Sequence, residues 1–175
     1  RERAVDTLAA GAAATAAVRD ASMRVGVIGG GISGLLCAQK LLALYPEHLS
    51  VSVFEWGRGP GGRTARRRVM LANGIELSFD HAAPRFTATS APFKALLQEW
   101  QAAGHAAPWP GAGEDAWVGT PSANSICRML SSRLAEAGGT LLFGRHVRTT
   151  THDTITGHWT VSATNRAGGA TETHT

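Results

Sequence analysis

The chain has 175 residues, which allows one domain of ordinary size, and its 43% apolar content is sufficient for a hydrophobic core. No run approaches the roughly 20 apolar residues of a membrane-spanning helix, so the sequence predicts a soluble protein without a membrane span. The formal net charge is +4, and the seven histidines are scattered without the spacing of a metal site.

The first 22 residues differ in composition from the rest of the chain. Nine of them are alanine, and three acidic residues balance three arginines. The segment 1–22 is compatible with an organelle transit peptide, an alanine-rich helix or a disordered leader, although transit peptides are usually poor in acidic residues. We expect the folded domain to begin at Met23 and to reside in the cytoplasm or an organelle, not outside the cell.

A glycine-rich turn follows the first predicted strand. The apolar run 23–28 predicts a strand and the leucine-rich run 35–44 predicts a helix, and between them lies a Gly-x-Gly-x-x-Gly spacing. The first glycine permits a tight turn, the second allows close approach of a pyrophosphate, and the third allows the helix to pack on the strand. The helix N-terminus adds free N–H groups and a partial positive charge. The predicted phosphate-binding residues are Gly29, Gly31, Ile32, Ser33 and Gly34.

Glu55 ends the second predicted strand, which begins at residue 49 and alternates in polarity. It lies 21 residues after Gly34, close to the roughly 20 expected of a carboxylate that accepts both ribose hydroxyls of a dinucleotide. A carboxylate disfavours a 2′-phosphate, so the position favours FAD or NAD over NADP. Trp56 follows directly and belongs to the predicted site. The alternative is a solvated glutamate at a strand end.

A second glycine-rich loop follows this carboxylate. Gly61, Gly62 and Arg63 lie six to eight residues beyond Glu55. This is more glycine than an ordinary strand-to-helix loop contains, and it suits backbone that lies against a flat or anionic ligand. Arg63 can bridge the diphosphate, so the loop favours FAD over NAD.

Five of the 17 basic residues lie within eleven positions: Arg58, Arg63, Arg66, Arg67 and Arg68. No aromatic residues interleave with them and no nucleic-acid-binding motif accompanies them, so we expect no nucleic-acid partner. If residues 64–71 form a strand, alternate arginines share one face. That face can contact the cofactor or an anionic substrate.

The remaining elements alternate between hairpins and helices. Asn73 and Gly74 predict a hairpin turn, and residues 79–86 predict a loop in which His81 is either a proton carrier or a structural histidine. Cys37 and Cys127 lack Cys-x-x-Cys spacing, so both are interpreted as buried free thiols. The polar, glycine-rich composition of residues 165–175 predicts a turn. Helices are predicted over 90–100 and 121–137, and strands over 140–143, 145–148 and 159–162.

The chain resembles the renalase-like branch of the flavin-dependent amine oxidase superfamily over roughly residues 23–159. That superfamily combines the first glycine motif, a ribose glutamate and a Gly-Gly-Arg sequence at this spacing. The matching residues are Val53-Phe54-Glu55, Gly57 to Arg63, Arg67-Arg68, Phe79-Asp80-His81, Phe86-Thr87, Trp109, Val118-Gly119, Pro121 and Asn124. The chain departs from the family pattern at Ala82, Pro84 and Arg85, near the expected position of the isoalloxazine ring.

The resemblance implies an α/β fold, namely a Rossmann-like FAD-binding domain with a partial substrate-domain insertion. It implies FAD-binding segments over 23–86 and 121–175, the second incomplete at its C-terminus, and an insertion over 87–120. A backbone group at Val147 is implied to reach the adenine.

The implied activity is that of an oxidoreductase with noncovalent FAD. Hydride would come from a small-molecule donor, an isomeric dihydronicotinamide dinucleotide or an amine, and O2 would accept the electrons. The alternatives are an NAD-linked dehydrogenase and a non-catalytic dinucleotide-binding fragment. The sequence indicates no catalytic residue and no oligomeric state.

Overall fold

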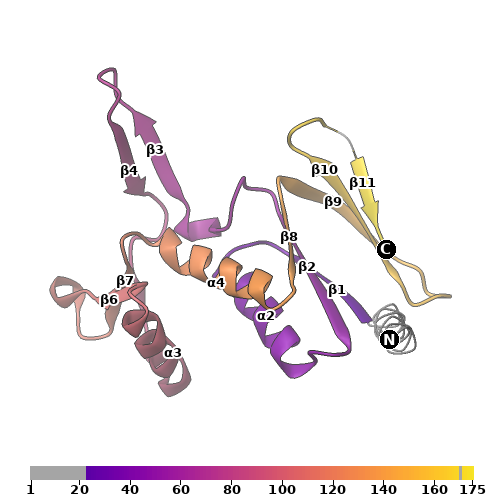
Figure 1. Cartoon of the computed structure of the whole chain (residues 1–175), viewed down its shortest axis with the longest axis horizontal. Coiled ribbons are helices and arrows are strands. Elements are labelled where there is room, and N and C mark those ends of the chain that lie inside the picture. Colours follow the sequence, from indigo (N-terminus) through magenta and orange to yellow (C-terminus); the bar gives the residue numbers. More distant parts are fainter. Residues whose placement is uncertain (1–22, 170) are drawn as a thin grey trace, which may run out of the picture.

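The computed structural model describes residues 23–169 and 171–175, so the predicted leader lies outside the described residues. The fold is mixed α/β and is centred on a parallel three-stranded sheet (Figure 1). The sheet has the order β1-β2-β8, with β1 at Met23–Ile28, β2 at Leu49–Glu55 and β8 at Thr140–Phe143. The two strands predicted around the first glycine turn are therefore neighbours.

Two helices cover one face of this sheet. Helix α2 (Ile32–Leu44) contacts β1 and β2, while α4 (Asn124–Glu136) contacts β8 and packs along α2. Val51 and Val53 on β2 are almost completely buried, as the predicted alternation requires. Because β1, α2 and β2 follow one another with β1 and β2 parallel, they form the βαβ unit that the sequence predicted.

An antiparallel sheet of order β11-β10-β9 covers the other side of β2. It consists of β9 (Arg145–His152), β10 (Trp159–Asn165) and β11 (Thr171–His174). Phe54, only 3% exposed, packs edge-on against the ring of His174 at 4.9 Å. The prediction that residues 165–175 form only a turn is wrong, because residues 171–174 pair with β10. This short polar segment becomes a strand through pairing and not through an apolar pattern.

A hairpin of β3 (Arg66–Met70) and β4 (Glu76–Asp80) projects from the body of the protein (Figure 1). The predicted Asn-Gly turn is confirmed, with Gly74 at φ +82°, a backbone angle that favours glycine. The expectation of a loop from residue 79 is corrected, because β4 continues through Phe79 to Asp80 opposite the arginines of β3.

Residues 86–119 form a separate small sheet with one helix. Strands β5 (Phe86–Thr87), β7 (Ala116–Gly119) and β6 (Ala106–Pro108) pair in that order, and α3 (Ala91–Ala102) packs beside β6. The helix predicted over 90–100 is confirmed, and its Leu97 and Trp100 side chains are fully buried. Two short 3-10 helices lie at Gly62–Thr64 and Pro110–Ala112.

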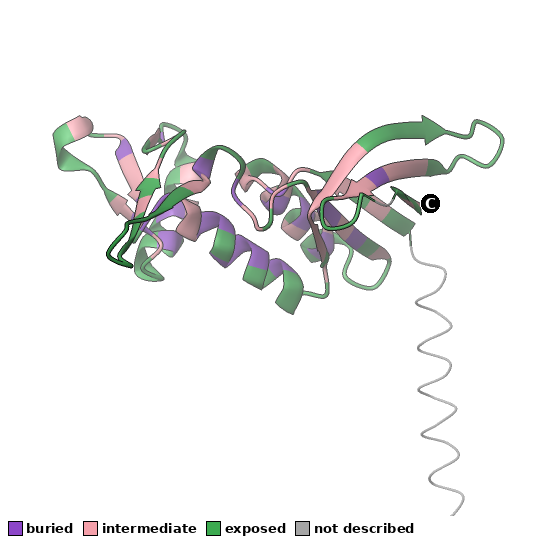
Figure 2. Cartoon of the chain, turned by 90° about the horizontal axis from the view of Figure 1, so that it is seen from above, coloured by how far each residue is buried: buried purple, intermediate pink, exposed green. Residues whose placement is uncertain are grey.

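Buried residues are concentrated where the helices meet the central strands, whereas the hairpin and the far end of the antiparallel sheet are exposed (Figure 2). Cys127 is buried as expected, but Cys37 is exposed. The buried stripe of α2 runs through Leu35, Ala38 and Leu42, and Cys37 lies outside it. Among the described residues, no helix is both long enough and apolar enough to cross a membrane.

Candidate dinucleotide-binding site

The glycine turn joins the end of β1 to the start of α2. Gly29 has φ +106°, and its N–H donates to the carbonyl of Phe54 at 2.8 Å, so the turn is tied to β2. A Cβ atom at position 34 would lie only 2.0 Å from the carbonyl oxygen of Gly29. The tight turn and the close packing predicted for these two glycines are therefore both present.

The N-terminus of α2 is available to an anion. Gly31 is the N-cap residue, no side chain caps the helix, and its first turn contains no acidic residue. The first N–H groups of a helix lack intrahelical acceptors and carry partial positive charge. Ile32 is half-buried and Ser33 is exposed in this first turn, so this end of the helix can receive phosphate oxygens.

The carboxylate of Glu55 lies beside this turn at the carboxyl end of β2. Its Oε2 accepts a hydrogen bond from the N–H of Gly30 at 2.6 Å, and its Oε1 accepts one from the N–H of Gly57, also at 2.6 Å. Each oxygen keeps lone-pair capacity for a further donor such as a ribose hydroxyl. Gly30 was not predicted as a site residue, although it is the middle glycine of the Gly-Gly-Gly sequence.

The second glycine loop lies directly on the first. The N–H of Gly61 donates to the carbonyl of Gly30 at 3.0 Å. Gly62 has φ +54°, and a Cβ there would be 3.4 Å from the Cα of Gly31. The structure thus brings together the two glycine segments that the sequence placed about 30 residues apart. Arg63 is exposed at the edge of the same loop.

The start of α4 holds this second loop in place. Asn124 donates its Nδ2 to the carbonyl of Pro60 at 2.7 Å, and Thr64 donates its hydroxyl to the carbonyl of Gly61 at 2.7 Å. The Cys127 sulfur lies 3.2 Å from the Thr64 Oγ1. Burial raises the pKa of the Cys127 thiol, an effect that the hydrogen bond with Thr64 partly opposes. Sequence reasoning did not identify these supporting roles, because the partners are far apart in the chain.

Asp80 connects the hairpin to the same helix. Its Oδ2 accepts a hydrogen bond at 2.9 Å from the N–H of Ala123, directly before α4. The following loop is joined to the second glycine loop, since the N–H of Ala83 donates to the carbonyl of Arg63 at 3.0 Å. His81, between these two connections, is exposed.

Trp56 and Val147, the two remaining residues predicted to contact the cofactor, lie on the side of Glu55 where β9 packs. Trp56 is 59% exposed, and its ring stacks on that of His146 with centroids 4.6 Å apart and planes 24° apart. The next residue, Val147, is half-buried and is paired with Ala163 of β10. His146 was not predicted; its proximity to Trp56 depends on the packing of β9 beside β2.

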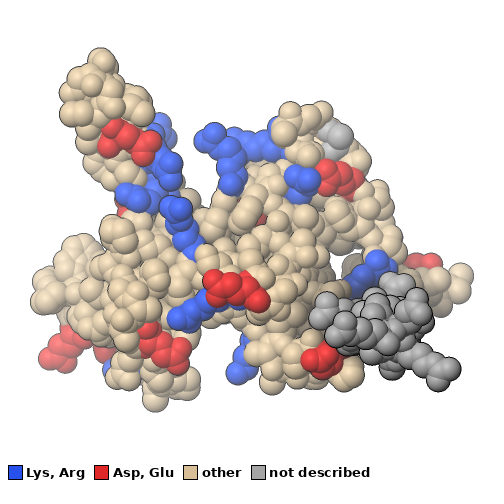
Figure 3. Space-filling model, in the orientation of Figure 1, with Lys and Arg blue, Asp and Glu red and all other residues tan. Residues whose placement is uncertain are grey.

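Positive charge surrounds the hollow between the hairpin and the antiparallel sheet. In the space-filling view, basic side chains follow the hairpin and reappear across the hollow, whereas most acidic side chains lie elsewhere (Figure 3). Arg58, Arg63, Arg67 and Arg68 are exposed, and within the part of the chain that the structure describes only Arg68 of these forms an ion pair, with Glu76 at 3.8 Å. Such a distribution raises the local concentration of anionic ligands.

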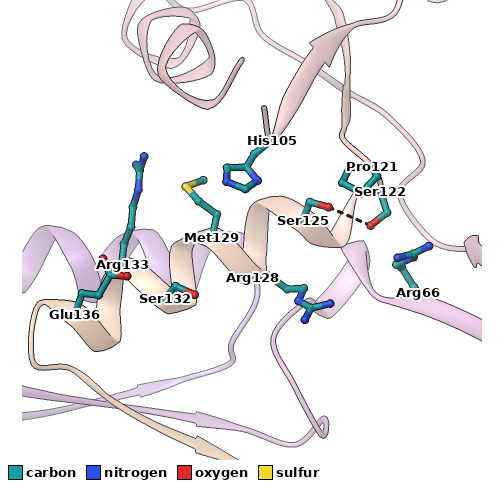
Figure 4. Close-up of a pocket in the computed structure, with 10 residues that line it drawn as sticks. All are labelled: Arg66, His105, Pro121, Ser122, Ser125, Arg128, Met129, Ser132, Arg133 and Glu136. Atoms are coloured by element: carbon teal, nitrogen blue, oxygen red, sulfur yellow. Dashed lines mark hydrogen bonds between the residues drawn. The ribbon is translucent and has the colours of Figure 1, made fainter. Parts of the chain in front are cut away.

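Two concave features lie along α4. A groove of about 540 Å³ follows the outer side of α4, with Arg66 at one end and Arg133 toward the other (Figure 4). A smaller cavity of about 290 Å³ lies between α4 and β8. None of the predicted cofactor residues lines either feature. Across residues 23–169 and 171–175, no cluster of three or more His, Cys, Asp or Glu side chains could hold a metal ion.

The parallel strands, the glycine turn and the carboxylate define a Rossmann-like domain of the kind that binds NAD(P) or FAD. Residues 27–100 match the family described as "NAD(P)-binding Rossmann-like domain". The match covers the glycine turn, Glu55, the second glycine loop, the hairpin and most of α3.

Solved structures share the fold at low sequence identity. THI4 of Thermovibrio ammonificans is 16% identical with a TM-score of 0.52, over 94% of this chain and 56% of that one. An oxidoreductase of Methanosarcina mazei is 13% identical with a TM-score of 0.51, over 87% of this chain and 57% of that one. CabE, an aromatic hydroxylase from angucycline biosynthesis, is 19% identical with a TM-score of 0.54, over 87% of this chain and 29% of that one. The chain thus spans between about a third and just over half of these proteins.

Proposed function

We propose that the chain is the FAD-binding part of a flavin-dependent oxidoreductase. The diphosphate of FAD would lie over the N-terminus of α2, with the adenosine ribose against Glu55. The second glycine loop, including Arg63, would cover the diphosphate, and Trp56 and the backbone of Val147 would border the adenine. Binding is proposed to be noncovalent.

The observation that carries this proposal is the meeting of three elements around Gly30. Its N–H donates to Glu55, and its carbonyl accepts from Gly61. The two glycine segments and the Glu55 carboxylate therefore meet at one hydrogen-bonded junction. An NAD site requires only the first glycine segment and the carboxylate. The second glycine segment adds backbone beside the proposed path of the diphosphate, and this additional backbone favours FAD.

The residues present suit an adenine dinucleotide. The missing side chain at Gly31 leaves room for a diphosphate beside the uncapped N-terminus of α2, whose first N–H groups can face it. The Glu55 carboxylate can accept ribose hydroxyls, but it would repel a 2′-phosphate at close range, which disfavours NADP. The exposed arginines around the hollow would balance the negative diphosphate.

When bound, FAD would supply the redox chemistry: it would take a hydride from a small organic donor and pass the electrons to O2. The protein's own part would be to bind, orient and neutralise charge. Two proteins of similar structure, an oxidoreductase and an aromatic hydroxylase, support this class of activity. An isomeric dihydronicotinamide dinucleotide or an amine is the proposed donor, on the basis of the renalase-like sequence features.

We also propose that residues 87–120 belong to a substrate domain inserted between FAD-binding segments at 23–86 and 121–175. In support, the small sheet β5-β7-β6 shares no strand with the central parallel sheet.

The second candidate is an NAD-linked dehydrogenase, which the description of the matched family favours. Direct binding distinguishes the two. Purified chain is titrated into FAD, FMN and riboflavin while flavin fluorescence is followed, and NAD and NADP are titrated by calorimetry. We expect saturable binding of FAD, at least tenfold weaker binding of FMN because it lacks the adenosine ribose, and no comparable binding of NADP.

A folded chain that binds NAD but not FAD would transfer the assignment to the second candidate. Failure of a folded chain to bind any of these nucleotides would overturn the proposal. If FAD binds but a longer form of the protein shows no O2 uptake with any reduced donor, the non-catalytic alternative is correct.

A further inference from the structure

Asn124, the first residue of α4, lies against the second glycine loop. Its Nδ2 donates to the carbonyl of Pro60 at 2.7 Å, although 64 residues separate the two in the chain. A Cβ atom at position 61 would lie only 2.6 Å from this nitrogen. The Asn124 amide therefore occupies space that a side chain at Gly61 would need, so the loop and the amide fit each other closely.

This hydrogen bond is the first in a series that passes through two peptide groups. The carbonyl of Pro60 and the N–H of Gly61 belong to one peptide group, and that N–H donates to the carbonyl of Gly30 at 3.0 Å. The carbonyl of Gly30 shares the next peptide group with the N–H of Gly31, the N-cap residue of α2. Both peptide groups are planar and trans, so holding the carbonyl of each fixes the direction of its N–H.

The N–H of Gly31 is the last group in this series. Among the residues that the structure describes, no acceptor pairs with it, so it is available to an oxygen of a ligand at the start of α2. Hydrogen bonds in series also polarise one another, because a carbonyl that accepts a hydrogen bond makes the N–H of its own peptide group a stronger donor. Gly30 and Gly61 are both buried, where this effect is larger than in water.

We infer that Asn124 is a positioning residue of the dinucleotide site. Through the Pro60–Gly61 and Gly30–Gly31 peptide groups, its amide orients and polarises the N–H that meets the diphosphate. The inference rests on the proposed function and adds a residue that acts on the ligand through the backbone. Thr64 does not belong to the series, because it donates to the carbonyl of Gly61 in the following peptide group.

Two substitutions of Asn124 and one control isolate this role. Asn124→Ala removes the donor, and Asn124→Asp replaces it by an acceptor of the same size. Ser125→Ala is the matched control, since Ser125 lies in the same turn of α4 and its hydroxyl pairs with that of Ser122 at 3.3 Å. Denaturant unfolding of each variant establishes that it is folded.

Nuclear magnetic resonance of the chain without FAD tests the series directly. We expect the amide proton of Gly61 to move to lower chemical shift in both Asn124 variants, because its hydrogen bond loses polarisation. The amide resonance of Gly31 should change with it, and both should stay unchanged in Ser125→Ala. A merely structural role of Asn124 would lower the unfolding midpoint but leave the amide of Gly31 where it is in the parent.

Ligand titrations test the consequence for binding. FAD is followed by fluorescence, and ADP, which carries a diphosphate without the flavin, is followed by calorimetry. We expect both Asn124 variants to bind each ligand about tenfold more weakly, as for one lost hydrogen bond, and Ser125→Ala to bind as the parent does. Equal weakening of FAD and ADP would locate the effect at the diphosphate and not at the flavin.

Unchanged FAD affinity in both Asn124 variants would overturn the inference and leave the proposed function intact. An unmoved Gly31 amide resonance, or an equal loss of affinity in Ser125→Ala, would also overturn it. If the folded parent bound neither FAD nor ADP, the proposed function would fail and the inference would fail with it.

Discussion

The Oε2 atom of Glu55 lies 2.6 Å from the backbone nitrogen of Gly30, so the carboxylate that ends β2 also anchors the turn after β1. The second oxygen is equally close to the nitrogen of Gly57 at the start of the next loop. One side chain thus organises both backbone segments that would meet a dinucleotide. Its substitution is expected to affect the turn and the ligand together.

Glu55→Gln keeps the size of the side chain but removes its charge and replaces one acceptor by a donor. We expect FAD affinity to fall by about 1.5–3 kcal/mol, the range for a lost charge-assisted hydrogen bond. Fluorescence titration measures the change, and Glu47→Gln, at an exposed turn, serves as the control. Equal FAD affinity in the two variants would remove Glu55 from the ribose site.

Gly34→Ala tests the packing of α2 on the turn. The new methyl group would lie 2.0 Å from the carbonyl oxygen of Gly29, a backbone atom that cannot move without shifting the turn. We expect a loss of about 3 kcal/mol in the free energy of unfolding, at the upper end of overpacking costs. Chemical denaturation provides the measurement. Gly111→Ala is the control, because its nearest neighbour is a side-chain atom at 3.9 Å; similar losses in both would refute the packing argument.

Asp80→Ala tests the connection between the hairpin and α4. Removal of the carboxylate leaves the N–H of Ala123 without its acceptor, and we expect a loss of about 1 kcal/mol, as for a helix cap. Denaturant unfolding of this variant should be compared with that of Glu114→Ala, an exposed position. If both variants unfold at the same denaturant concentration, the hydrogen bond contributes nothing to stability.

The buried thiol of Cys127 makes stability depend on pH in the alkaline range. Burial raises its pKa in the folded state, so between the ordinary thiol pKa and the raised value the folded chain holds a proton that the unfolded chain has released. The free energy of unfolding is therefore at its full value below the ordinary thiol pKa, and it falls as the pH rises through this window.

Denaturation measured at pH 7.5 and at several higher pH values should show this fall in the parent and in Cys37→Ala. The fall should be smaller in Cys127→Ala, which removes the buried titrating group. An unchanged pH dependence in Cys127→Ala would exclude the thiol as its cause. Other alkaline transitions act equally on all three proteins and cancel in the comparison.

Much of the central fold was predictable because its signals are local. The Gly29 turn, the Asn73-Gly74 hairpin and helix α3 each depend on backbone preferences or on spacing within a few residues. Cys37 was misjudged because α2 buries a narrow stripe, which the sequence around Cys37 does not reveal. The strand at residues 171–174 was missed because a short polar segment pairs only when β10 is already beside it.

Local signals in the amino-acid sequence were enough to predict the strand–turn–helix unit, the carboxylate at its expected distance and the second glycine segment, since glycine spacing and strand alternation act over short stretches. The contacts that hold that segment are visible in the folded chain alone. Asn124 reaches Pro60 across 64 residues, Cys127 reaches Gly61 across 66, and Asp80 reaches Ala123 across 43. Such pairings carry no local pattern, because they form only when the chain returns through α4 to complete the parallel sheet.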